Sequence, residues 1–206
     1  MGWLDRITGE DPPVAEQTPE PTEPEALDRP SLGVKALFDG VTPDSAHSVL
    51  DLGRASESSF NVYARFARRI RFADLLRAER RADLDRALGE SVPAQPDRPY
   101  DLILVWDLLD RVAPESRAPL IARLAERAAP RARLHVLVEA SDRSAVQPFH
   151  FTVLDVDRVR YTPDGPERPA RGRLLPAEVE RLLQPFEVAR AFTSRSGMRE
   201  YMGILQ

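Results

Sequence analysis

The run YDLILVWDLLD, residues 100–110, constrains the fold of this chain more than any other segment. Its residues 102–106 are all apolar, without the alternation that marks a strand with one face in water. A continuous apolar run is typical of a strand covered on both faces, as in a parallel sheet with helices on either side. The run therefore predicts a central strand of a layered α/β fold.

Shorter strands and helices alternate along the chain on both sides of this run. Further strands are predicted at residues 48–52, 69–74 and 133–140. Between the strands, helices are predicted from the apolar positions Val34, Leu37 and Phe38 after a cap at Ser31; Phe60, Tyr63, Ala64 and Ala67; Leu84 and Leu88 within residues 75–88; and Leu120, Ile121, Leu124, Ala125 and Ala128 before Pro130. This alternation favours a Rossmann-like fold, with a mostly parallel sheet and helices on both faces.

The last third of the chain has a different pattern. FHFTVLD and RVRYTP predict a hairpin that turns at residues 155–157, and Pro176 is expected to open a helix. FEVARAFTS and MREYMGIL predict a C-terminal antiparallel strand pair. Strand 133–140 contains His135, which we expect to be a packed core or sheet-face histidine rather than a ligand.

The first 30 residues differ from the rest in composition. They hold eight acidic residues against two arginines, and six prolines lie within residues 10–30. Such a segment buries too little apolar surface to fold alone, so we expect a flexible tail over residues 1–30 and one folded domain over 31–206. Trp3, Leu4 and Ile7 would share one face of a short helix. This amphipathic segment could dock a protein partner, or it could be a frayed terminus.

Composition excludes several classes of function. The chain has no cysteine, which excludes disulfides, thiolate metal sites and cysteine nucleophiles, and its three histidines are scattered, so no metal site is expected. Outside residues 1–30 the charge is close to neutral, and this gives no strong nucleic-acid signal. No apolar run of transmembrane length is present. We expect a cytoplasmic protein.

The strand at 48–52 ends in VLDLG, an acid and a glycine at the carboxyl end of a buried strand. Together with YDLILVWDLLDRVAP and LLPAEVERLLQPFEVARAF, in this order and spacing, it resembles the class I S-adenosylmethionine (SAM)-dependent methyltransferases. The resemblance covers residues 31–206. It implies SAM as the cofactor and Asp51, Gly53 and Asp74 as cofactor-binding residues, with Asp74 accepting hydrogen bonds from the ribose hydroxyls.

The chain departs from the family's pattern in the loop after Gly53. Ala55 and Glu57 stand where two further glycines would be, and a carboxylate there would repel the carboxylate of SAM unless the loop points it outward. The same stretch could be a plain strand–loop–helix joint, with Ser58 or Ser59 as the helix cap. Asp74, likewise, could simply cap a helix that starts at Leu75.

The usual third strand is not evident either. Only residues 75–99 separate Asp74 from Tyr100, and they predict one helix and a loop. Loss of that strand would leave a sheet edge that needs cover.

Asp107 and Asp110 follow the strand at 100–106, at the end where open α/β sheets bind ligands. Asp107 could act as a catalytic base or orient a substrate, and it could equally shape a turn. Trp106 could stack on a substrate, but a position in the core is expected. Two functions remain open: a methyltransferase-like pseudoenzyme that serves as a binding or scaffold module, and an active SAM-dependent methyltransferase on an unidentified substrate.

Overall fold

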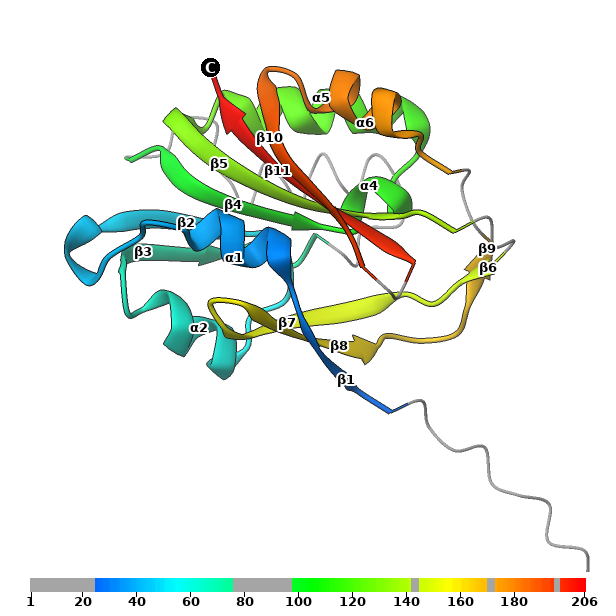
Figure 1. Cartoon of the computed structure of the whole chain (residues 1–206), viewed down its shortest axis with the longest axis horizontal. Helices are drawn as coiled ribbons and strands as arrows, with labels where there is room; N and C mark the ends of the chain where they lie inside the picture. The colour runs from blue at the N-terminus through cyan, green and yellow to red at the C-terminus, as the bar shows by residue number, and fades with distance from the viewer. Residues whose placement is uncertain (1–24, 76–97, 142–144, 170–172, 195–196) are drawn as a thin grey trace, which may run out of the picture.

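A six-stranded sheet forms the centre of the molecule (Figure 1). The computed structural model describes residues 25–75, 98–141, 145–169, 173–194 and 197–206. The strand order is β10-β11-β5-β4-β2-β3, with bounds β2 His47–Asp51, β3 Ala67–Phe72, β4 Tyr100–Trp106, β5 Ala128–Glu139, β10 Phe186–Thr193 and β11 Met198–Leu205. The neighbours among β3, β2, β4 and β5 are parallel, and β11 and β10 are added antiparallel. The mostly parallel sheet and the C-terminal antiparallel pair are confirmed.

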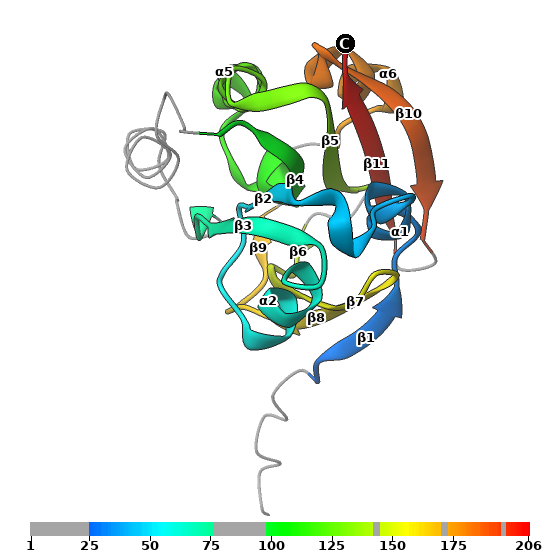
Figure 2. The same cartoon turned by 90° about the vertical axis from the view of Figure 1, so that its left-hand side faces the viewer.

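Helices cover both faces of this sheet. The helices α5 (Pro114–Ala125) and α6 (Pro176–Leu183) lie together on one side, and α1 (Leu32–Phe38) and α2 (Glu57–Tyr63) lie on the other (Figures 1 and 2). A short 3₁₀ turn, η1 (Pro43–Ser45), precedes β2, and α4 (Leu108–Arg111) follows β4. Ser31 caps α1 as expected, since its hydroxyl accepts a hydrogen bond from the Val34 amide at 3.1 Å. Within the described residues, no helix is long and apolar enough to cross a bilayer.

A second, three-stranded sheet packs beside α2 (Figure 2). Its order is β1-β8-β7, with bounds β1 Leu27–Pro30, β7 Phe149–Asp155 and β8 Arg158–Pro163. The predicted hairpin at residues 155–157 is confirmed by the β7–β8 pairing. Two short strands, β6 (Ala145–Val146) and β9 (Arg168–Pro169), flank β7 and β8 in the sequence and pair with each other. The Ser59 hydroxyl of α2 accepts a hydrogen bond from the Val153 amide of β7 at 2.9 Å, which ties this sheet to α2.

The last residues of the expected tail take part in a sheet. Residues 27–30, assigned to the tail, form β1 and pair antiparallel with β8. Proline and charged residues are tolerated there because β1 is an edge strand, with its side chains largely exposed. Residues 1–24 lie outside the described residues, so the rest of the expected tail remains a prediction.

Two predicted helices end earlier than expected. α2 stops at Tyr63, and Ala67 already begins β3, so Ala67 does not extend the helix face. Phe60 is 51% exposed and is therefore not part of the core. α5 stops at Ala125 because residues 128–130 belong to β5. The helix predicted within residues 75–88 falls mainly on residues that the structure does not describe.

The strand β3 forms one edge of the six-stranded sheet, and β10 forms the other edge. No described strand pairs with the outer side of β3. Residues 76–97, where a third strand of the family's pattern would fall, lie outside the described part of the chain. On the other border, β10 pairs with β11, and its register shifts between Val188 and Arg190.

Candidate functional site

Asp51 lies at the end of β2 and is almost completely buried. Its Oδ1 accepts hydrogen bonds from the Trp106 indole Nε1 at 2.6 Å and from the Gly53 amide at 2.8 Å. Its Oδ2 accepts a hydrogen bond from the Tyr63 hydroxyl at 2.7 Å. Burial raises the pKa of Asp51 to about 6, although these three hydrogen bonds favour the charged form and act against the shift. The first acid of the predicted motif is thus held by the protein's own donors.

Trp106 closes the end of β4, next to Asp51. Its ring has no exposure to solvent. The indole stacks on the Phe151 ring with centroids 5.0 Å apart and an angle of 4°, and it meets the His135 ring edge-on at 5.5 Å. Trp106 has a positive φ of 58°, an uncommon conformation for a bulky residue. The expected core position of Trp106 is confirmed.

Gly53 lies close against this indole. A Cβ atom on Gly53 would lie 2.9 Å from Nε1 and 3.1 Å from Cδ1 of Trp106, and 3.0 Å from Asp51 Oδ1. Contacts under about 3.0 Å cannot be accommodated without movement, so this position requires glycine. The side chain that needs this close approach to the backbone is the protein's own tryptophan.

The loop that follows carries Ala55 and Glu57 away from Asp51. Both residues are exposed, and Glu57 is the first residue of α2. An acidic residue in the first turn of a helix is favourable because it faces the positive end of the helix dipole. The helix cap is Ser56, whose hydroxyl accepts from the Ser59 amide at 3.2 Å, and not Ser58 or Ser59 as expected. The loop therefore takes the outward arrangement, and Glu57 does not crowd the glycine turn.

Asp74 follows β3 and lies beside the same turn. Its amide donates to the Gly53 carbonyl at 3.1 Å, and its φ is 47°. The structure thus brings the three predicted cofactor-binding residues, Asp51, Gly53 and Asp74, to one end of the adjacent strands β2 and β3. Whether Asp74 binds a ribose stays a prediction. Its alternative role as a helix cap concerns residues after Leu75, outside the described part of the chain.

Asp107 is engaged by an arginine of its own helix. Arg111 donates from Nε to Asp107 Oδ1 at 2.8 Å and from Nη2 to Oδ2 at 2.9 Å, and Nη2 also donates to the Phe149 carbonyl of β7. Burial raises the pKa of Asp107, and the Arg111 charge acts in the opposite direction. This pair joins α4 to β7. Asp107 precedes α4 without a side-chain capping bond.

Asp110 anchors the end of β5. Its Oδ2 accepts from the Glu139 amide at 2.7 Å. Burial raises the pKa of Asp110 to about 7, and the nearby charge of Asp107 adds to the shift.

A second buried polar cluster lies behind Trp106. His135 is fully buried, as expected, and its Nε2 lies 3.5 Å from Glu200 Oε2. The same carboxylate oxygen accepts from the Ser31 hydroxyl at 2.5 Å and from the Gly33 amide at 2.7 Å. Burial alone would raise the pKa of Glu200, but His135, Ser31 and Gly33 together lower it. Glu200 could not be identified from any local pattern in the sequence. Within the described residues, no three acids or histidines are grouped so as to hold a metal ion.

The aromatic cover over Trp106 was also missed. Phe151 and Tyr161, from β7 and β8, are buried and meet edge-on with centroids 5.1 Å apart. Alternate aromatic residues in FHF were the one local signal that this hairpin buries a face. Phe151 in turn stacks on the indole of Trp106, so the hairpin covers that ring.

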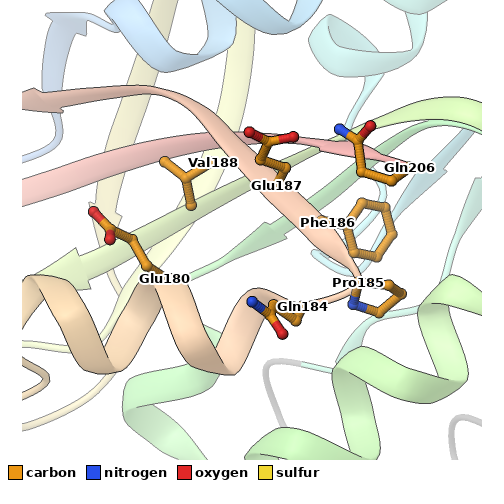
Figure 3. Close-up of a pocket in the computed structure, with 7 residues that line it drawn as sticks. All are labelled: Glu180, Gln184, Pro185, Phe186, Glu187, Val188 and Gln206. Atoms are coloured by element: carbon orange, nitrogen blue, oxygen red, sulfur yellow. The ribbon is translucent and has the colours of Figure 1, made fainter.

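A pocket of about 660 Å³ lies at the other end of the sheet (Figure 3). It is lined by Glu180, Gln184, Pro185, Phe186, Glu187, Val188 and Gln206. Phe186 begins β10 and pairs with Leu205 at the end of β11, so the pocket sits at the sheet end opposite to Asp51 and Asp74. In open α/β sheets ligands bind at the carboxyl ends of the parallel strands, and this pocket does not occupy that place.

The fold is similar to that of solved methyltransferases. Magnesium protoporphyrin IX methyltransferase from Synechocystis PCC 6803, solved with bound SAH, aligns with a TM-score of 0.50 at 16% identity, over 84% of this chain and 80% of that one. The N-methyltransferase NodS from Bradyrhizobium japonicum WM9 aligns with a TM-score of 0.47 at 13% identity, over 84% and 93% of the two chains. The sequence matches no protein-family model and no curated protein. At such identities the likeness establishes the fold, which is methyltransferase-like, as predicted.

Proposed function

We propose that this chain is a methyltransferase-like pseudoenzyme whose SAM site is degenerate, and that it works as a binding or scaffold module. The observation that carries the proposal is the position of Trp106, whose indole covers Gly53 and donates to Asp51. As a cytoplasmic scaffold, the chain would tether a protein partner through its acidic N-terminal segment.

The steric reasoning starts from the role of glycine after the first strand. The resemblance implies that the methionine part of SAM approaches the backbone there, because glycine leaves room for it. In this chain the indole lies 2.9 Å from the point where a Cβ of Gly53 would be. The room that glycine provides is therefore taken up by Trp106.

A cofactor would have to move a well-held ring. Trp106 would lose its hydrogen bond to Asp51 and its stacking on Phe151. Removing a buried tryptophan from its packing costs about 3–5 kcal/mol. A cost of about 3 kcal/mol would weaken cofactor binding more than 100-fold. This weakening supports the proposal that the chain does not bind SAM at the ordinary cellular concentrations of SAM.

Calorimetric titration of the purified chain with SAM, and separately with SAH, tests the proposal. We expect no saturable heat with either ligand up to about 100 µM, because the site is already filled. Saturable binding in the low micromolar range would contradict the proposal.

An active SAM-dependent methyltransferase is the second candidate. It is favoured by the meeting of Asp51, Gly53 and Asp74 at one end of β2 and β3, with the Asp74 amide bonded to the Gly53 carbonyl. In that case SAM should bind tightly and Asp74→Ala should abolish binding, because the ribose hydroxyls lose their acceptor. Asp44→Ala, an exposed acid in η1, is the matched control and should bind SAM unchanged.

A further inference from the structure

The strand β1 is attached to the second sheet along one side only. It has four residues, and it pairs with β8 from Leu27 opposite Tyr161 to Pro30 opposite Arg158. No other described strand borders it. In Figures 1 and 2, β1 lies at the margin of the molecule, away from the six-stranded sheet.

Exposed side-chain contacts hold the body of β1. Asp28 accepts two hydrogen bonds from Arg160, at 2.6 and 2.8 Å, and both side chains are more than a third exposed. The Arg29 guanidinium lies 5.5 Å from the centre of the Tyr161 ring. Exposed ion pairs of this kind are weak, since water and salt screen them.

The following residue, by contrast, is anchored in the core. The Ser31 amide donates to the Asp157 carbonyl at 2.8 Å, and the Ser31 hydroxyl donates to the buried Glu200 carboxylate. Ser31 is 1% exposed. Buried contacts thus fix the chain at Ser31, whereas β1 before it is held by its backbone pairing with β8 and by these exposed side-chain contacts.

A series of ring contacts leads from the strand next to β1 to Asp51. Tyr161, opposite Leu27, meets Phe151, which stacks on Trp106, and Trp106 donates to Asp51. All of these rings are buried. Detachment of β1 removes the cover of Tyr161 and makes β8 an open edge.

We propose that β1 is a releasable strap that controls access to the Trp106–Asp51 site. Local detachment of β1 from β8 loosens the β7–β8 hairpin and frees the indole of Trp106 from Asp51, without unfolding of the six-stranded sheet. In the proposed function Trp106 closes the site, and release of β1 would open it. The inference therefore rests on the proposed function. Calorimetry with SAM tests the function separately, because strap opening is measured without any ligand.

Hydrogen exchange of the Trp106 indole proton, followed by NMR, reports the opening directly. Trp3→Phe leaves Trp106 as the only tryptophan, because the chain has two. In this background we expect the indole proton to exchange faster than the Ile103 amide in the buried strand β4, and with almost no dependence on added urea. A small urea dependence marks a local opening, since little surface is exposed.

Variants of the ion pair then identify the strap as the moving part. Asp28→Ala should accelerate indole exchange about fivefold, because it removes a contact present only in the closed form. The charge swap of Asp28→Arg with Arg160→Asp should restore the original rate. Asp39→Ala, which removes an exposed pair with Arg190 at the other sheet, is the matched control and should leave the rate unchanged.

Two results would overturn the proposal. One is an indole proton that exchanges with the same rate and urea dependence as the Ile103 amide, which would mean that only global unfolding frees Trp106. The other is an unchanged indole rate in Asp28→Ala while the amides of β8 exchange faster, which would mean that the strap opens without reaching the site.

Discussion

At the scale of single residues, Asp51 is a carboxylate that the fold has satisfied internally. Three donors converge on it, from β4, from α2 and from the glycine turn. Burial nevertheless keeps its pKa at about 6, above the ordinary value of 3.8. The folded chain therefore binds a proton at Asp51 more readily than the unfolded chain does.

This difference predicts how stability depends on pH. Since the folded pKa is the higher one, the stabilising effect of protonation is complete below about pH 3.8 and is lost as the pH rises through about 6. Asp51→Asn, which is neutral at all pH values, should therefore gain stability relative to the wild type between pH 4 and pH 7. The relative gain should be roughly 3 kcal/mol. Urea unfolding of both proteins across this range measures the difference.

The exposed acid Asp39 provides the control for this experiment. Asp39→Asn should follow the wild-type pH curve closely. If Asp51→Asn also runs parallel to the wild type, burial does not raise the pKa of Asp51 in the way described.

The residues of the site were predictable to different degrees. Asp51, Gly53 and Asp74 follow strands that the apolar runs identify, so their meeting at one sheet edge could be foreseen. The direction of Glu57 could not, because it depends on which serine caps α2. The contact of Trp106 with Phe151 also escaped prediction, since it joins residues distant in sequence.

At the scale of secondary-structure elements, the β7–β8 hairpin acts as a cover for the site. Its inward residues Phe151, Val153, Val159 and Tyr161 are buried. Their burial depends on the rings of β7 and β8 packing against β4 through Trp106. The hairpin therefore owes its stability to the main sheet as much as to its own pairing.

Truncation of the covering ring tests this view. Phe151→Ala should lower the free energy of unfolding by about 3–5 kcal/mol, because it leaves a cavity against the indole. Phe60→Ala removes the same atoms from an exposed position on α2 and should change stability by less than about 0.5 kcal/mol. Thermal or urea unfolding compares the two. Equal losses in both variants would contradict the role assigned to Phe151.

The elements themselves were largely foreseen from local patterns. Apolar runs predicted the strands β2, β4 and β5, the spacing of apolar residues predicted α1, and Pro176 predicted the start of α6. The strand β1 was missed because LDRP contains a proline and two charges, a composition typical of linkers. Only its pairing with β8, far along the chain, makes it a strand.

At the scale of the whole molecule, Arg111 links α4, which follows β4, to the strand β7 of the second sheet. Arg111 binds Asp107 with two hydrogen bonds and donates a further one to the Phe149 carbonyl of β7. The pair is about nine-tenths buried, so its geometry matters more than that of a surface pair.

Loss of this link should be costly. Arg111→Ala leaves the buried Asp107 carboxylate without its partner and should destabilise the chain by about 3–5 kcal/mol. Arg65→Ala breaks the exposed pair with Asp155 and should cost less than about 1 kcal/mol. Urea unfolding at pH 7 measures both. A small loss in Arg111→Ala would show that the packing of α4 against β7 does not depend on this link.

The outer border of the main sheet has a consequence for how copies of this chain behave together. The register of β10 shifts between Val188 and Arg190, and the strand carries the charges of Glu187 and Arg190. A bulge bends the border away from the flat line that another strand would need, and charges along it disfavour close approach of a second border. This side of the molecule is therefore a poor template for growth of one sheet onto another, which protects the chain there against fibrous aggregation.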